Sequence, residues 1–328
     1  MAHMIDETTG TAAIAYVGKT PWHGLGQQLT EGASIQEWTE QARLNYSVLE
    51  SPALFRTGAA SEPQLIPNRK ALYRSDTGAP LAVVSSSYHV VQPAEVMGFF
   101  GKLADIGGFS LETAGALSDG KRIWALARVG AEREIKGLPG DSVKPYLLLG
   151  TSYDGTMATV AKFTPVRVVC NNTITLALEN EAAAGVRVLH RERFDADKVR
   201  VQLGIVQDSY EAFMYNAHQL AQRSMDRVEC DAFVAELLAP YHQGSRPVRE
   251  SRAFKRVMDL FEGAAIGSDI GGVFGTRWQA LNAVTQLVDH ERGRSDNTRL
   301  ESAFFGTGAT IKNRALDMLT TISQFEAV

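Results

Sequence analysis

The strongest constraint on the fold of this chain is a series of apolar, strand-type segments joined in pairs by short turns. Three such pairs occur, at residues 71–74 with 81–84, 109–117 with 122–129, and 146–149 with 157–163. Their turns contain Gly78, Gly120 and Gly155, and glycine or aspartate tolerates the positive φ that a tight turn requires. The pattern predicts antiparallel β-hairpins.

Two helices are predicted around these hairpins, and a third before them. Pro93 suits a first helical turn, and apolar residues at helical spacing extend that helix to about Ile106. The alanine and leucine content of residues 172–184 predicts another helix. Near the start of the chain, Ser34 followed three residues later by Glu37 is typical of a helix N-terminus.

After residue 193 the pattern is almost wholly helical, with amphipathic stretches at 197–225, 230–238 and 252–262. A glycine-rich break at 266–275 precedes two further helices. We therefore expect an α+β protein, with antiparallel hairpins and covering helices followed by a helical C-terminal part. The expected units are an N-terminal segment (1–68), an antiparallel sheet core with helices (69–193), and a helical C-terminal part packed on the core (194–328).

Composition narrows the class of protein. The chain of 328 residues has 45% hydrophobic and 21% charged residues, which is typical of a globular fold. No apolar run approaches the roughly 20 residues that cross a bilayer, and the N-terminus lacks a secretory signal pattern. Two cysteines fit a reducing compartment. We expect a cytoplasmic protein without a membrane span.

Motifs for cofactors and catalysis are incomplete. Gly24-Leu25-Gly26 lacks the third glycine of a dinucleotide loop, and Gly306-Thr307-Gly308 lacks the lysine of a phosphate loop. The seven histidines form no zinc motif. We expect no cofactor, no metal and no catalytic residue. These incomplete motifs favour a protein that is not an enzyme over one that is.

Cys170 follows Arg167 closely, and a guanidinium could favour its thiolate. The stronger interpretation is a small buried residue at a strand-to-helix junction, with Asn171 and Asn172 as helix N-caps. Asp289-His290 could supply a base or a ligand, but such residues are more often a solvated helix end. An enzyme would have to assemble its site from His23, Cys170 and Asp289/His290.

Basic residues cluster around the hairpins, although the formal net charge is −4. The candidate nucleic-acid-binding residues are Lys121, Arg122, Lys162, Arg167, Arg187 and Arg191. A stripe of this kind could hold a phosphate backbone, with Tyr146, Tyr153 or Phe163 offering ring faces to bases. The competing interpretation is a surface of mixed charge, because Glu192 interrupts the run.

Several strings together resemble one protein family, the domain of unknown function 932. The strings are Met1-Ala2-His3, Pro21-Trp22-His23-Gly24-Leu25-Gly26, Tyr88-His89-Val90-Val91-Gln92, Asp154-Gly155, Arg167-Val168-Val169-Cys170-Asn171-Asn172-Thr173, Gly275-Thr276-Arg277-Trp278, and Asp289-His290 before Phe305-Gly306. The resemblance extends from Met1 to about Leu319. Within it, Trp22, His23, Tyr88, Cys170 and Asn172 are expected to be structural motif residues.

The resemblance implies a protein of phages, prophages or plasmids, with no settled activity. At the level of fold, the order of elements also resembles the core of single-strand annealing proteins, although four strands follow the first core helix here where that core has three. The first hypothesis is a non-enzymatic, oligomeric protein that binds or anneals single-stranded DNA. The alternatives are a host-interaction module, which would use Trp22 and the Gly24-Leu25-Gly26 loop, and the enzyme described above.

Overall fold

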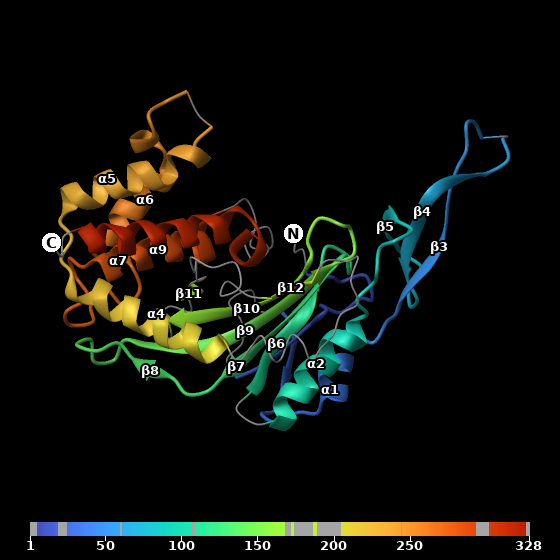
Figure 1. Cartoon of the computed structure of the whole chain (residues 1–328), viewed down its shortest axis with the longest axis horizontal. Helices are drawn as coiled ribbons and strands as arrows, with labels where there is room; N and C mark the ends of the chain where they lie inside the picture. The colour runs from blue at the N-terminus through green and yellow to red at the C-terminus, as the bar shows by residue number, and fades with distance from the viewer. Residues whose placement is uncertain are drawn as a thin grey trace.

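The computed structural model describes residues 5–18, 25–59, 61–106, 109–167, 172–173, 186–188, 205–243, 245–292 and 302–325. Over these residues the protein has the expected α+β architecture, with antiparallel sheets in the N-terminal part and helices in the C-terminal part (Figure 1). No helix among the described ranges is long and apolar enough to span a membrane.

The main sheet contains nine strands among the described residues, in the order β11-β10-β9-β7-β6-β1-β2, with β12 pairing β10 and β8 pairing β9. The strands are β1 (Ile14–Val17), β2 (Gln27–Leu29), β6 (Phe109–Leu117), β7 (Arg122–Val129), β8 (Arg133–Glu134), β9 (Ser142–Ser152), β10 (Thr159–Arg167), β11 (Asn172–Thr173) and β12 (Val186–Val188). All pairs are antiparallel except β1 with β2. The second and third predicted hairpins are therefore neighbours in one sheet.

A second, three-stranded sheet consists of β3 (Val48–Phe55), β4 (Gln64–Arg74) and β5 (Pro80–Ser85). The β4–β5 hairpin was predicted, but β3 was not. The boundary expected at residue 68 falls inside β4, and β1 pairs with β6 of the main sheet. We call this sheet the arm, because β3 and β4 project away from the rest of the molecule (Figure 1).

The helices of the described residues include the expected ones after Ser34, at 93–106 and in the C-terminal part. They are α1 (Ile35–Gln41), α2 (Pro93–Ile106), α4 (Ile205–Gln222), α5 (Arg227–Leu238), α6 (Arg252–Asp259), α7 (Arg277–Gln286) and α9 (Thr307–Phe325), with short 3-10 turns at Ala239–Tyr241 and Val248–Glu250 and π-helical turns at Leu260–Ala264 and Leu287–Glu291. Ser34 caps α1, and its side chain and that of Glu37 form the reciprocal capping box.

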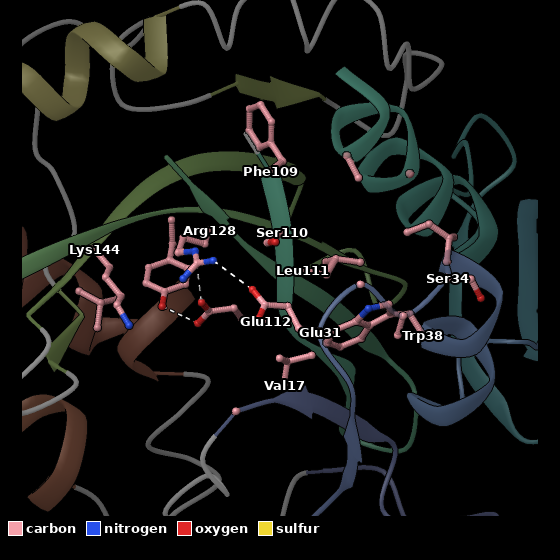
Figure 2. Close-up of a pocket in the computed structure, with 18 residues that line it drawn as sticks. Val17, Glu31, Ser34, Trp38, Phe109, Ser110, Leu111, Glu112, Arg128 and Lys144 are labelled. Atoms are coloured by element: carbon pink, nitrogen blue, oxygen red, sulfur yellow. Dashed lines mark hydrogen bonds and ion pairs between the residues drawn. The ribbon is translucent and has the colours of Figure 1, made fainter. Parts of the chain in front are cut away.

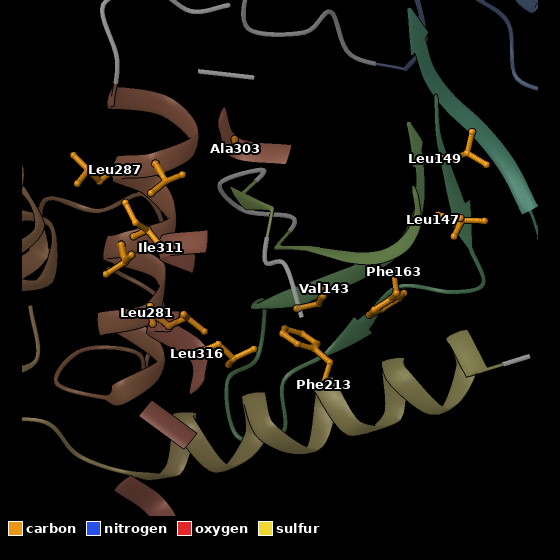
Figure 3. Close-up of a cluster of buried hydrophobic side chains, with 14 of the residues drawn as sticks. Val143, Leu147, Leu149, Phe163, Phe213, Leu281, Leu287, Ala303, Ile311 and Leu316 are labelled. Atoms are coloured by element: carbon orange, nitrogen blue, oxygen red, sulfur yellow. The ribbon is translucent and has the colours of Figure 1, made fainter. Parts of the chain in front are cut away.

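One face of the main sheet is covered by helices. Leu147 and Leu149 of β9 and Phe163 of β10 point toward this face, where α2 and α4 pack. Phe213 of α4 lies between the sheet and the C-terminal helices, where Leu316 of α9 also packs (Figure 3). The resulting core is continuous from the sheet into the helical part, so the two expected units share one hydrophobic core.

The opposite face, which we call the second face, has a smaller apolar cluster. Trp124 and Leu126 of β7 pack there with Leu148 of β9 and with Phe304. The ring centroids of Trp124 and Phe304 are 5.9 Å apart. A Cβ at Gly150 would lie 2.6 Å from Phe305, so the close approach of this ring requires glycine. The segment at 302–305 therefore covers the middle of the second face.

The second glycine of the Gly24-Leu25-Gly26 motif has a structural role. Gly26 has a φ of +107°, and a Cβ there would lie 2.7 Å from Ile14 Cγ2 and 2.8 Å from its carbonyl oxygen. Glycine is needed because β2 begins beside β1 at this point.

The predicted helix at 172–184 is wrong at its start. Asn172 and Thr173 form strand β11, in which Asn172 pairs with Arg167 and Thr173 with Val166. Asn172 is therefore a hairpin residue and not a helix N-cap, because pairing with β10 overrides the local helix propensity. Residues 174–184 lie outside the described residues.

Candidate functional site

Arg167, one of the predicted DNA-binding residues, is fully buried. Its Nε and Nη2 donate to the two carboxylate oxygens of Asp141 at 2.6 and 2.7 Å, and Trp278 Nε1 donates to the same carboxylate at 2.9 Å. The guanidinium also donates to the carbonyls of Ile266 and Gly267. Arg167 joins the sheet to the C-terminal helices, and its side chain has no exposed surface to offer a phosphate.

Lys162 lies on the second face beneath the covering segment. Its Nζ donates to the Phe304 carbonyl at 2.5 Å and lies 5.6 Å from the centre of the Phe305 ring. Burial, together with the charge of Lys312, lowers the pKa of Lys162 to about 8. This lysine is held by the protein's own carbonyl and ring.

Arg122 and Lys121 lie at the turn between β6 and β7, at the far end of the second face. Arg122 donates to the Thr156 hydroxyl at 2.8 Å and lies 3.7 Å from the carboxylate of Asp154. Lys121 is half-buried in the turn, whose residues Asp119 and Gly120 have the expected positive φ. The two cations are separated from the other end of the face by the apolar cluster.

The remaining candidates are only partly described. Arg187 lies in β12, opposite Val160 of β10, and its side chain is outside the described part. Arg191, Trp22, His23 and Cys170 lie outside the described residues. The predicted aromatic residues separate, because Tyr146 lies on the second face while Tyr153 and Phe163 are buried in the main core.

Tyr88 and Asp289 are held in the fold, and His290 beside Asp289 is half-buried. Tyr88 is buried and donates from its hydroxyl to the Ser152 carbonyl at 2.6 Å, which ties its loop to β9. Asp289 is buried and accepts a 2.7 Å hydrogen bond from Lys312 Nζ. Burial lowers the pKa of Lys312, and its ion pair with Asp289 opposes that effect. The residues described contain no group of three side chains suited to a metal ion.

A large hollow near the sheet lies at the end of the second face, beside α1 and α2. It has a volume of about 820 Å³ and an apolar wall that includes Val17, Trp38 and Leu111. Its polar wall includes Glu31, Glu112, Arg128, Lys144 and Tyr146. Figure 2 shows Arg128 pointing toward Glu112 and Glu31, with Lys144 alongside. A hollow of this size with convergent polar groups is the usual form of a binding site.

The register of the strands brings these cations together. Arg128 of β7 is directly opposite Tyr146 of β9, and Lys144 lies two residues before Tyr146 on the same face. A second hollow of about 500 Å³ adjoins the first, because Phe109, Ser110, Arg128 and Lys144 line both. We call the two hollows together the trough.

The cations of the trough are paired only loosely. Arg128 lies 3.6 Å from Glu31 and 3.7 Å from Glu112, and Lys144 lies 3.8 Å from Glu132. These separations are longer than hydrogen bonds. By contrast, Tyr146 donates to Glu112 at 2.5 Å, and burial, with the adjacent Glu112 charge, raises the pKa of Tyr146. The phenol therefore stays protonated and fixes the carboxylate.

Sequence reasoning missed Arg128, Lys144 and Glu112. The signal that could have found Arg128 is the two-residue period of β7, which puts it on the same face as Arg122, Trp124 and Leu126. The same reasoning could not identify Lys144, because the strand predicted from the sequence begins at residue 146, whereas β9 begins at Ser142. Its place follows from the pairing of β7 with β9.

Comparisons with known proteins identify a family but no activity. The model of a family described as "Domain of unknown function (DUF932)" matches residues 80–305, which include β5 through the segment that covers the second face. No curated protein and no solved structure matches the chain. The matched region covers more than half of the chain, and the protein therefore belongs to the family of the domain of unknown function 932.

Proposed function

We propose that this protein is a non-enzymatic, oligomeric protein that binds or anneals single-stranded DNA in the cytoplasm, as part of a phage, prophage or plasmid, and that the trough is its binding surface. One observation carries the proposal. Arg128 and Lys144 line the trough at side-chain exposures of 34% and 28%, and each is more than 3.5 Å from its nearest carboxylate partner. They can therefore donate hydrogen bonds to a ligand.

Three ion-paired arginines of the C-terminal part are engaged more tightly. Arg227, Arg249 and Arg256 each donate a hydrogen bond of 2.5 or 2.6 Å to a carboxylate. Loose, solvent-exposed ion pairs contribute only about 0–1 kcal/mol. A phosphate oxygen can thus replace Glu31 or Glu132 beside the trough cations at little cost, and charge-assisted bonds to phosphate are strong.

The shape of the trough supports a single strand as the ligand. Phosphates would lie along Arg128 and Lys144, while the half-buried ring of Phe109, which lines both hollows, offers a face on which a base can stack. With a formal net charge of −4, the whole chain does not attract nucleic acid. Binding is therefore local, weak for one subunit and strengthened when several subunits hold one strand.

Fluorescence anisotropy with a labelled single-stranded oligonucleotide tests the proposal. At about 50 mM salt, where phosphate contacts are strong, we expect the native protein to bind and the variant Arg128→Gln/Lys144→Gln to bind at least about tenfold more weakly. The matched control is Arg249→Gln, which removes an exposed arginine far from the trough and should leave binding unchanged. No anisotropy change at micromolar native protein, or equal losses in both variants, would overturn the proposal.

A further inference from the structure

The tip of the arm exposes large apolar side chains that the chain itself does not cover. Leu54, Phe55 and Leu65 are 57%, 43% and 60% exposed. Leu54 lies directly opposite Leu65 in the β3–β4 pairing, beyond the point where β5 ends its pairing with β4 at Arg69. The tip is therefore a two-stranded ribbon, which is marginally stable in water without a covering layer.

A second set of exposed apolar side chains lies on the C-terminal part. Val228 and Phe274 are 77% and 66% exposed, and Ile266 is 49% exposed. Val228 follows Arg227, whose Nε donates to Glu262 at 2.5 Å. Gly263 follows Glu262, and a Cβ at Gly263 would lie 3.9 Å from the Phe274 ring. These residues form a surface that we call the end patch.

The two surfaces lie at opposite ends of the molecule. Figure 1 shows β3 and β4 at one end of the long axis and the C-terminal helices at the other. A contact between the arm tip of one subunit and the end patch of the next would therefore join different surfaces. Such a heterologous contact repeats from subunit to subunit and gives a ring or a filament.

The charges of the two surfaces are complementary. From residue 54 to residue 70, the arm carries the exposed Arg56 and Arg69 against one exposed glutamate, Glu62. Around the end patch, the exposed arginine is Arg227, and the exposed carboxylates are Asp226, Glu229, Glu262 and Asp269. Opposite net charge at the rim favours encounter in one orientation and opposes contact between two end patches.

We infer that the arm tip of one subunit docks on the end patch of a second copy of this chain, which gives head-to-tail assembly. The apolar side chains Leu54, Phe55 and Leu65 meet Val228, Ile266 and Phe274, and the arginines of the arm face the carboxylates of the patch. This inference stands independently of the trough, because neither surface includes a trough residue. It specifies how the proposed oligomer would form.

The test uses two full-length variants, each with one surface disabled. The arm variant is Leu54→Asp/Leu65→Asp and the patch variant is Val228→Asp/Phe274→Ser. All four side chains are more than half exposed, so the fold should persist, and circular dichroism and thermal unfolding check this. The matched control is Tyr215→Ser, a 65% exposed aromatic residue outside both surfaces.

Sedimentation of the native protein and Tyr215→Ser should give a mass that rises above the monomer with concentration, while each disabled variant stays monomeric. A mixture of the two variants should form a 1:1 dimer and nothing larger, because one intact arm and one intact patch remain. The inference is overturned if the native protein is monomeric at about 100 μM, where a contact with a Kd of about 10 μM would largely form. It is also overturned if either variant assembles like the native protein, or if the mixture stays monomeric.

Discussion

Arg167 and Asp141 form a buried, two-pronged ion pair at the junction of the sheet and the C-terminal helices, with Nε–Oδ1 and Nη2–Oδ2 distances of 2.6 and 2.7 Å. Asp141 also accepts the indole N–H of Trp278 from α7. One carboxylate therefore links β10 to a helix more than a hundred residues away. Its charge is balanced within the protein, which removes Arg167 from the surface that could meet a ligand.

Breaking this pair should be costly. Asp141→Asn leaves the Arg167 charge buried without a counter-charge, and we expect the free energy of unfolding to fall by about 3–5 kcal/mol. The control is Asp231→Asn, which removes the half-buried partner of the exposed Arg249 and should cost at most about 1 kcal/mol. Urea unfolding followed by circular dichroism measures both. Equal losses of unfolding free energy in the two variants would show that the buried pair contributes no more to stability than the surface pair.

Two glycines with positive φ should respond differently to alanine. Gly26→Ala strains the backbone and forces a Cβ to within 2.7 Å of Ile14, so we expect a loss of about 2–4 kcal/mol. Gly10 has a φ of +80° with nothing within 4 Å of its Cβ position, so Gly10→Ala should cost about 1 kcal/mol from backbone strain alone. Thermal or urea unfolding compares them. A smaller loss for Gly26→Ala would contradict the proposed contact with β1.

The pKa of Lys162 predicts a change of stability with pH. Burial, with the Lys312 charge, lowers this pKa from 10.5 to about 8, so between these values the unfolded chain binds more protons than the folded one. The contribution of Lys162 to the free energy of unfolding should therefore rise with pH through this window, by about 1–2 kcal/mol up to about pH 9.5.

Urea unfolding of the native protein and Lys162→Met at several pH values isolates this contribution. The difference between the two proteins should change through the window and be constant below about pH 7, where lysine is protonated in both states. A difference that is independent of pH would contradict the lowered pKa.

Glu112 competes with a phosphate for Arg128, and its neutralisation should strengthen nucleic-acid binding. Glu112→Gln keeps an acceptor for the Tyr146 hydroxyl but removes a negative charge 3.7 Å from the guanidinium. The charge interaction is worth about 1 kcal/mol in water, so oligonucleotide affinity should rise about threefold to tenfold in anisotropy titrations. Glu50→Gln on the arm is the control. Weaker binding by Glu112→Gln would count against the trough as the site.

Local patterns predict those elements whose stabilising contacts are local. The capped start of α1 at Ser34, the helix from Pro93 to Ile106 and the β6–β7 hairpin all follow from caps, spacing and turn residues. β3 was missed because Pro52 lies within it, a register shift occurs between Pro52 and Leu54, and most of its side chains are exposed. A strand of this kind has no regular alternation of apolar residues.

The candidate site depends on contacts between distant segments, which local patterns do not contain. Hairpin reasoning pairs β6 with β7 and β9 with β10, but the trough depends on β7 lying beside β9, which brings Arg128 opposite Tyr146. The burial of Arg167 similarly depends on Asp141 and Trp278. Lys162 and Arg167, which are close together in the sequence, therefore separate in space, and Arg128 and Lys144 come together.

The salt dependence of oligonucleotide binding tests the central claim most directly. If Arg128 and Lys144 each neutralise one phosphate, the slope of log K against log salt should become less steep by about 1.4 in Arg128→Gln/Lys144→Gln, at about 0.7 per phosphate. The slope of Arg249→Gln should equal that of the native protein. Identical slopes in all three proteins would contradict the account, because the strand would then be held by other residues.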